Sequence, residues 1–396
     1  MSDSAPAKPP RLGSIDAYRG WVMLLMLGEV LHFASVSKAL PDSAFWRFLA
    51  WHQHHVEWVG CSLHDLIQPS FSFLVGVALP FSLSSRMAQG QPEWKMTLHA
   101  CWRGLVLVLL GVFLRSIGQK HTVWTFEDTL SQIGLGYPLL YWLGRRNPPI
   151  QGLALAVILI GYWAAWALFP LPGPDFDYAA VGGSPDWKYN LTGFAAHWNK
   201  FTNLGAAFDH WFLNLFPRRH PFTSNSGGYL TLSFIPTLGT MLLGLVAGRW
   251  LRAPYQPKET LRRLGLAGGI AIATGLTLHF AWICPIVKKV WTPSWTLFSG
   301  GMCFLLLAAF YGIIDVRGWR KWAFPWVVIG ANSMAAYLMA HLMEDFLRET
   351  FLTHLGPDYA KIFGTPYAPV ISGLLVLMTF WLILFWMYRR KIFLKV

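Results

Sequence analysis

Long apolar segments recur along the whole chain, and they constrain its fold more than any other feature. A helix needs about 20 apolar residues to cross roughly 30 Å of hydrocarbon, and backbone groups inside a bilayer must be satisfied internally. The sequence therefore predicts an all-α, polytopic transmembrane bundle (17–396) after a polar N-terminal tail (1–16). The ten predicted spans are 17–37, 66–86, 97–117, 128–144, 150–170, 229–250, 263–283, 295–314, 323–345 and 367–388.

Composition and charge agree with a membrane protein. Of the 396 residues, 54% are hydrophobic and 13% are charged, whereas a soluble domain has about 25% charged residues. The net charge of +13 could indicate a nucleic-acid partner. The positive-inside rule is the favoured explanation, because the basic residues concentrate in alternate connections. No nucleic-acid partner is expected, and both termini are predicted to be cytoplasmic. The longest connection on the opposite face, 171–228, is a candidate cap.

A block of ionisable residues directly precedes the second predicted span. Charged groups at a membrane boundary are costly and are therefore functional candidates, and imidazole suits proton transfer near neutral pH. Ser62 and Asp65 have the spacing of a helix capping box. Asp65 can also orient a histidine, and the two roles are compatible. A zinc site is the less favoured alternative, since His-x-His-His is not a helical ligand pair. The block contains His52, His54, His55, Glu57, His64 and Asp65.

Polar residues also lie inside the predicted first and ninth spans. Asp16 and Arg19 stand at the entry of the first span, where an interfacial salt bridge explains them as well as a function does. Deeper in this span, Glu29 and His32 are one helical turn apart and are predicted to share a face toward a polar cavity. In the ninth span a polar stripe with helical spacing is predicted, for function or for bonding to a neighbouring helix. This stripe contains Asn332, Ser333, Tyr337 and His341.

Five short motifs, in order along the chain, resemble those of the heparan-α-glucosaminide N-acetyltransferase family and its bacterial relatives. They are R-L-x-S-x-D-x-x-R-G over 11–20; H-x-x-W-x-G-x-x-x-x-D-L-x-x-P-x-F-x-F-x-x-G over 55–76; Q-I-G-x-x-Y over 132–137; P-x-x-K-x-x-W-T-P-S over 285–294; and G-x-N-S-x-x-x-Y over 330–337. Val59 and Val287 stand where the family pattern has Asn, and the run from Ser131 to Ile133 lacks the Arg of the family's Q-R-I.

The resemblance implies a membrane acetyltransferase that takes acetyl-CoA from the cytoplasmic side and acetylates an amino sugar or related glycan on the opposite side. By position, His55 would be the catalytic histidine and Asp65 its acidic neighbour. His55 would act as a base or carry the acetyl group itself. No metal is expected. Candidates for lining the substrate or donor site are Asp16, Arg19, Glu29, His32, His54, Gln132, Lys288, Asn332, Ser333 and Tyr337.

Several questions stay open at the level of sequence. The motifs read most like a bacterial subgroup, so the expected location is a bacterial inner membrane, and a homodimer is left open. A sugar transporter without acyl-transfer chemistry is the main alternative, because polar residues on two spans can also line a translocation path. A metal-binding membrane protein is the weaker alternative.

Overall fold

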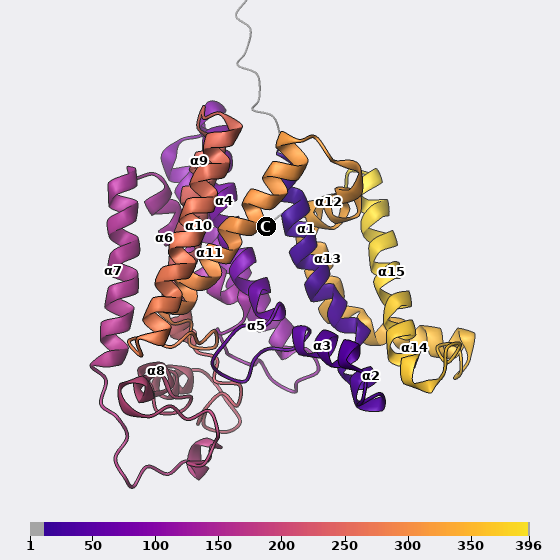
Figure 1. The fold of residues 1–396 in the computed structure, drawn as a ribbon, viewed down its shortest axis with the longest axis horizontal. Coiled ribbons are helices and arrows are strands. Elements are labelled where there is room, and N and C mark those ends of the chain that lie inside the picture. Colours follow the sequence, from indigo (N-terminus) through magenta and orange to yellow (C-terminus); the bar gives the residue numbers. More distant parts are fainter. Residues whose placement is uncertain (1–11, 395–396) are drawn as a thin grey trace, which may run out of the picture.

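The computed structural model describes residues 12–394 and shows a bundle of helices (Figure 1). Within this range the only β-type pairing is a single bridge between Val59 and Val287. The α-helices are α1 (Gly13–Leu27), α2 (Phe33–Ala39), α3 (Ala44–His52), α4 (Ile67–Ala88), α5 (Glu93–Ser116), α6 (Thr129–Gly144), α7 (Pro148–Ala167), α8 (Leu204–Phe212), α9 (Phe234–Arg252), α10 (Pro257–Phe280), α11 (Pro293–Phe310), α12 (Phe324–Ala331), α13 (Ser333–Leu342), α14 (Glu344–Leu355) and α15 (Ala368–Arg389).

The all-α transmembrane architecture is confirmed, but the count of ten spans is not. In the described residues, seven helices are long and apolar enough to cross a membrane, or up to nine if two bent pairs each count as one span. The fourth predicted span, 128–144, corresponds to α6, which has 16 residues. At 1.5 Å per residue it extends about 24 Å, less than the hydrocarbon thickness. Helix α1 begins at Gly13, and residues 1–11 of the expected tail lie outside the described range.

Helices α4 and α9 form the centre of the bundle through backbone contact. A Cβ atom added at Gly76 would overlap the carbonyl of Met241, and one at Gly244 would overlap the carbonyl of Phe73. Small residues at such crossings allow membrane helices to approach closely and gain packing energy. Helices α7 and α10 lie at the periphery and expose most of their apolar windows. The central pair thus forms a rigid support for the loop that precedes α4.

Two of the predicted spans are broken, which corrects two predictions. In the first predicted span, helix α1 is followed by a 3₁₀ turn (Gly28–Leu31), and His32 after it has a left-handed backbone with φ 47°. Glu29 and His32 therefore do not share a helical face, and His32 contacts Glu344 instead (Nε2 to Oε1, 3.2 Å). The ninth bends by 68° between α12 and α13 at Asn332. The predicted polar stripe is split there, because Asn332 is outside the helix that carries the other three residues.

The long connection 171–228 folds into short helical segments at one end of the bundle (Figure 1). Its one α-helix, α8, has nine residues and is too short to span a bilayer. Trp198 from this connection is fully buried, and its carbonyl accepts a hydrogen bond from the Trp58 indole (3.2 Å). The connection is therefore packed against the loop that carries the histidine block.

Candidate active site

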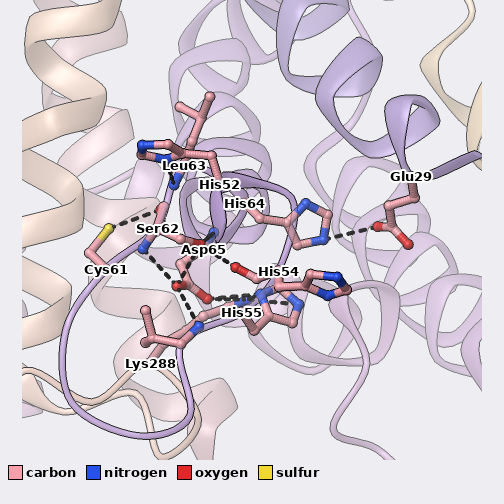
Figure 2. A network of polar contacts seen from close by, with 11 residues as sticks. Glu29, His52, His54, His55, Cys61, Ser62, Leu63, His64, Asp65 and Lys288 are labelled. Carbon is pink, nitrogen blue, oxygen red and sulfur yellow. Dashed lines mark hydrogen bonds and ion pairs between the residues drawn. The ribbon is translucent and has the colours of Figure 1, made fainter. Parts of the chain in front are cut away.

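His55 and Asp65 meet in the loop between α3 and α4. His55 Nδ1 lies 2.8 Å from Oδ1 of Asp65 (Figure 2). Because a carboxylate only accepts, this contact places the hydrogen of the neutral imidazole on Nδ1 and leaves the lone pair on Nε2. The Asp65 side chain is 1% exposed, whereas that of His55 is 36% exposed. The buried acid therefore holds an accessible base in one orientation and one tautomer.

The local sequence explains why Asp65 is fixed. Its Oδ2 accepts bonds from the backbone N–H of Ser62 (2.9 Å), the Ser62 hydroxyl (3.0 Å) and the backbone N–H of Val56 (3.2 Å). The Asp65 N–H in turn donates to the Ser62 hydroxyl (3.3 Å). This reciprocal pair confirms the predicted capping box. One carboxylate thus closes the loop, begins the α4 segment and holds the histidine.

Lys288 completes the cluster from a distant part of the chain. Its ammonium lies 3.4 Å from Asp65 Oδ1, and the Lys288 side chain is 4% exposed. The loop that carries it is paired with the histidine loop, because Gly60 donates its N–H to the carbonyl of Ile286 (3.1 Å). Gly60 has φ 120°, a conformation that favours glycine. Thr292 closes the lysine loop by bonding the Pro285 carbonyl (2.7 Å) and capping α11.

The surroundings of His55 keep it neutral. Burial and the positive charge of Lys288 lower the pKa of His55 to about 4, although Asp65 acts in the opposite direction. Burial also lowers the pKa of Lys288, while Asp65 favours its charged form. A neutral imidazole at physiological pH retains the Nε2 lone pair that a base or nucleophile needs.

A second histidine–acid pair lies beside the first. His64 Nε2 lies 3.0 Å from Oε1 of Glu29 (Figure 2). The rings of His55 and His64 are 4.6 Å apart between centroids. The two pairs therefore form one continuous group, with His64 between Glu29 and His55.

Two cavities adjoin at this cluster. The site cavity, about 330 Å³, is lined by His55, Lys288, Glu29, His64 and Arg115, among others. The second cavity, about 620 Å³, is the basic cavity, because its wall includes Arg19, Arg86, His99 and Arg103. Both cavities share three lining residues: Phe71, Thr129 and Tyr337.

The remaining sequence candidates occupy different places. Arg19 forms the predicted salt bridge with Asp16 (3.4 Å) and lines the basic cavity, as does Ser333. Gln132 lines neither cavity; its amide binds the carbonyls of Phe126 (3.0 Å), Leu230 (3.1 Å) and Thr231 (3.3 Å), and so joins two connections. His54 contributes its backbone carbonyl, which accepts a bond from the Ser62 hydroxyl.

Asn332 has a structural role. Its side-chain amide donates to the Ile392 carbonyl (2.8 Å), and its carbonyl oxygen accepts from the Leu394 N–H (3.1 Å). The last described residues are thus tied to the break between α12 and α13, and Leu394 reaches the basic cavity.

Sequence reasoning did not single out several cavity residues. Arg86 and Arg103 are among the basic residues that the positive-inside rule explains, and their shared wall with Arg19 is a tertiary feature. His64 belonged to the predicted block, but its pairing with Glu29 had no sequence signal. Between residues 12 and 394, no group of three or more His, Cys, Asp or Glu side chains is arranged to hold a metal ion.

No protein-family model matches the chain. It is 24% identical to human (Homo sapiens) heparan-alpha-glucosaminide N-acetyltransferase over 434 aligned residues, which cover 98% of this chain and 60% of the human protein. It is 23% identical to the mouse (Mus musculus) heparan-alpha-glucosaminide N-acetyltransferase, again over 98% of this chain and 60% of the relative. The chain thus spans about three-fifths of the length of these relatives. With the five motifs in order and the match extending along nearly its whole length, the chain is a homologue of the heparan-alpha-glucosaminide N-acetyltransferases.

Proposed function

We propose that this protein is an integral membrane acetyltransferase that moves an acetyl group from acetyl-CoA to an amino sugar or related glycan. The observation that carries the proposal is that His55 and Lys288 line a cavity that shares a wall of three residues with the basic cavity. The donor and the acceptor can then approach the wall from opposite sides. The names of the relatives, which specify N-acetyl transfer to a glucosaminide, support this assignment.

The basic cavity has the chemistry that a CoA donor requires. Coenzyme A carries several phosphate charges, which guanidinium groups bind through charge-assisted hydrogen bonds. Arg103 donates to the Tyr137 hydroxyl (3.0 Å), and its Nε is buried without a hydrogen-bond partner in the described residues. We assign this cavity to the cytoplasmic side because Arg86 and Arg103 follow the predicted positive-inside pattern. In a bacterial cell, a protein whose basic cavity opens to the cytoplasm would lie in the inner membrane.

The cluster supplies what acyl transfer to an amine needs. His55 Nε2 removes a proton from the attacking amine while the C–S bond of acetyl-CoA breaks and CoA leaves as a thiolate. Alternatively, Nε2 attacks the acetyl carbonyl carbon, CoA leaves as a thiolate, and the acetyl group passes from Nε2 to the amine. Asp65 holds the imidazole and stabilises the positive charge that develops on it. The Lys288 ammonium, beside both residues, is placed to stabilise the negative oxygen that forms on the acetyl carbon.

Acetyl-CoA binding by detergent-purified protein tests the proposal, because a ligand of the folded state raises the apparent unfolding temperature. We expect acetyl-CoA to stabilise both wild type and His55→Ala, and to stabilise Arg103→Met less. Arg262→Met is the matched control, since Arg262 is exposed on α10 and pairs with Glu259. Labelled acetyl transfer to D-glucosamine should require His55. Absence of any stabilisation of wild type, together with sugar uptake into proteoliposomes, would favour a transporter.

A further inference from the structure

Glu29 gives the site cavity an accessible negative charge. Its side chain is 55% exposed and lines this cavity. The other acids nearby are already engaged: Asp65 is buried under its four donors, and Glu344 pairs with Arg348 (3.0 Å) as well as His32. In the described part of the chain, the one ion pair of Glu29 is with a histidine. Glu29 is therefore the carboxylate of this cavity that is best able to take a cationic ligand.

The break in the first span sets the position of the Glu29 carboxylate. Gln53 clamps both ends of the break, donating to the Gly28 carbonyl (2.6 Å) and accepting from the Phe33 N–H (2.8 Å). The 3₁₀ turn between these clamps turns Glu29 toward His64, as Figure 2 shows. A carboxylate at the border of a membrane span is costly and needs a partner. His64, 9% exposed, supplies one and leaves the second carboxylate oxygen open to the cavity.

Glu29 is joined to the reacting centre through His64. His64 bonds Glu29 at 3.0 Å, its ring centroid is 4.6 Å from that of His55, and all three residues line the site cavity. The amine of an amino sugar is an ammonium ion in neutral water, and an ammonium–carboxylate hydrogen bond is stronger than one to a neutral hydroxyl. Arg115 and Lys288 also line the cavity; Lys288 is paired with Asp65 (3.4 Å), and the charge of Arg115 acts on Glu127.

We propose that Glu29, oriented by His64, binds the ammonium group of the acceptor and makes a cationic amine, not a hydroxyl, the group that this site selects. The inference rests on the proposed acetyl transfer and adds the residue that sets its acceptor class. Loss of the Glu29 charge should weaken acceptor binding and leave donor binding intact, because Glu29 lines the site cavity and not the basic cavity.

The test compares Glu29→Gln with wild type. Glutamine keeps the shape and the acceptor for His64 and removes the charge. We expect the KM for D-glucosamine to rise about tenfold or more, the size of one charge-assisted hydrogen bond, with acetyl-CoA stabilisation unchanged. Glu57→Gln, an exposed position in the histidine loop, is the matched control and should behave as wild type. An unchanged KM in Glu29→Gln overturns the inference while leaving the proposed function in place.

A second measurement does not depend on the variant folding. In wild-type protein, thermal-shift titration should show D-glucosamine binding about tenfold or more tightly than D-glucose, which carries a neutral hydroxyl in place of the amine. Equal binding of the two sugars overturns the inference. Absence of acetyl-CoA binding to wild type would instead refute the proposed function. The ratio of the binding affinities for D-glucosamine and D-glucose would still test the role of Glu29.

Discussion

Lys288 places its ammonium nitrogen 2.9 Å from Nδ1 and 3.3 Å from Nε2 of His55, although 233 positions separate the two residues in the chain. Because Nδ1 donates to Asp65, Nε2 is the ring nitrogen that can accept from the ammonium. Protonation of His55 would put two positive charges in contact. The lysine therefore keeps the histidine neutral, and an acceptor or acetyl group must displace it from Nε2 for His55 to react.

Substitution of His55 should remove chemistry and spare donor binding. We expect His55→Ala to lower the rate of acetyl transfer to D-glucosamine by about 10²-fold or more, the usual contribution of a positioned general base. Acetyl-CoA should stabilise the variant as it does wild type, because His55 lies in the site cavity and the donor is assigned to the basic cavity. A variant that binds acetyl-CoA and retains full transfer activity would refute the catalytic assignment.

Removal of Lys288 should move the acid limb of the pH–rate profile. In wild type His55 is neutral above its pKa of about 4, so activity should be lost as the pH falls through that value. In Lys288→Met the nearby positive charge is gone, and the pKa of His55 should rise toward its ordinary value. We expect the acid limb to shift upward by roughly one to two pH units. Transfer rates between pH 4 and 8 measure this shift.

Lys289→Met is the matched control for the lysine prediction. Lys289 is adjacent in sequence, but its ammonium lies 5.7 Å from the centre of the Tyr229 ring. The acid limb of the pH–rate profile of Lys289→Met should coincide with that of wild type. If Lys288→Met gives the same profile as Lys289→Met, Lys288 does not set the titration of His55.

Close packing of the central helices predicts that a larger side chain at Gly244 prevents correct folding. We expect Gly244→Leu to prevent assembly of monodisperse protein in detergent, because any Cβ at this position overlaps the backbone of α4 at Phe73. Gly265→Ala on α10 is the control, since an added Cβ there meets no atom within 4 Å. It should unfold at the wild-type temperature or slightly above, because alanine has the higher helix propensity. Equal yields and unfolding temperatures would contradict the packing described.

A buried acid in the connection 171–228 predicts a pH-dependent stability. Burial raises the pKa of Asp209 to about 7, although the Thr231 N–H donates to its carboxyl group (2.9 Å). The folded protein therefore holds a proton here that the unfolded chain releases near its ordinary pKa of about 3.8. The stabilisation is fully present below pH 3.8 and is lost as the pH rises through 7. Asp209→Asn, which stays neutral, should unfold at a higher temperature than wild type at pH 8, with the difference shrinking toward pH 5.

The fold was predictable from the sequence where a single physical signal decides it. Long apolar runs located the helices that cross the bundle, since the cost of burying charge in lipid leaves few alternatives. The apolar runs did not predict the breaks at His32 and at Asn332. Each broken pair of helices still has the length and hydropathy of a candidate span, and tertiary contacts from Gln53 and from the chain near Leu394 hold the breaks.

The candidate site was predictable in part. The spacing of Ser62 and Asp65 predicted their capping box, and the family motif placed His55 beside Asp65; the structure contains both contacts. The pairing of Glu29 with His64 could not be predicted, because helical periodicity places Glu29 near His32. The catalytic and lining roles of these residues stay predictions until activity is measured.

Phe71, Thr129 and Tyr337 line both cavities, so the two cavities meet at these three side chains. In the proposed reaction only a two-carbon acyl group would pass between these side chains, whereas a hydrated ion or a sugar would need an open passage. A protein that works in this way would exchange a covalent bond between two compartments and keep the membrane electrically tight. The cell would then modify material beyond its own permeability barrier without spending its ion gradients on transport of the donor.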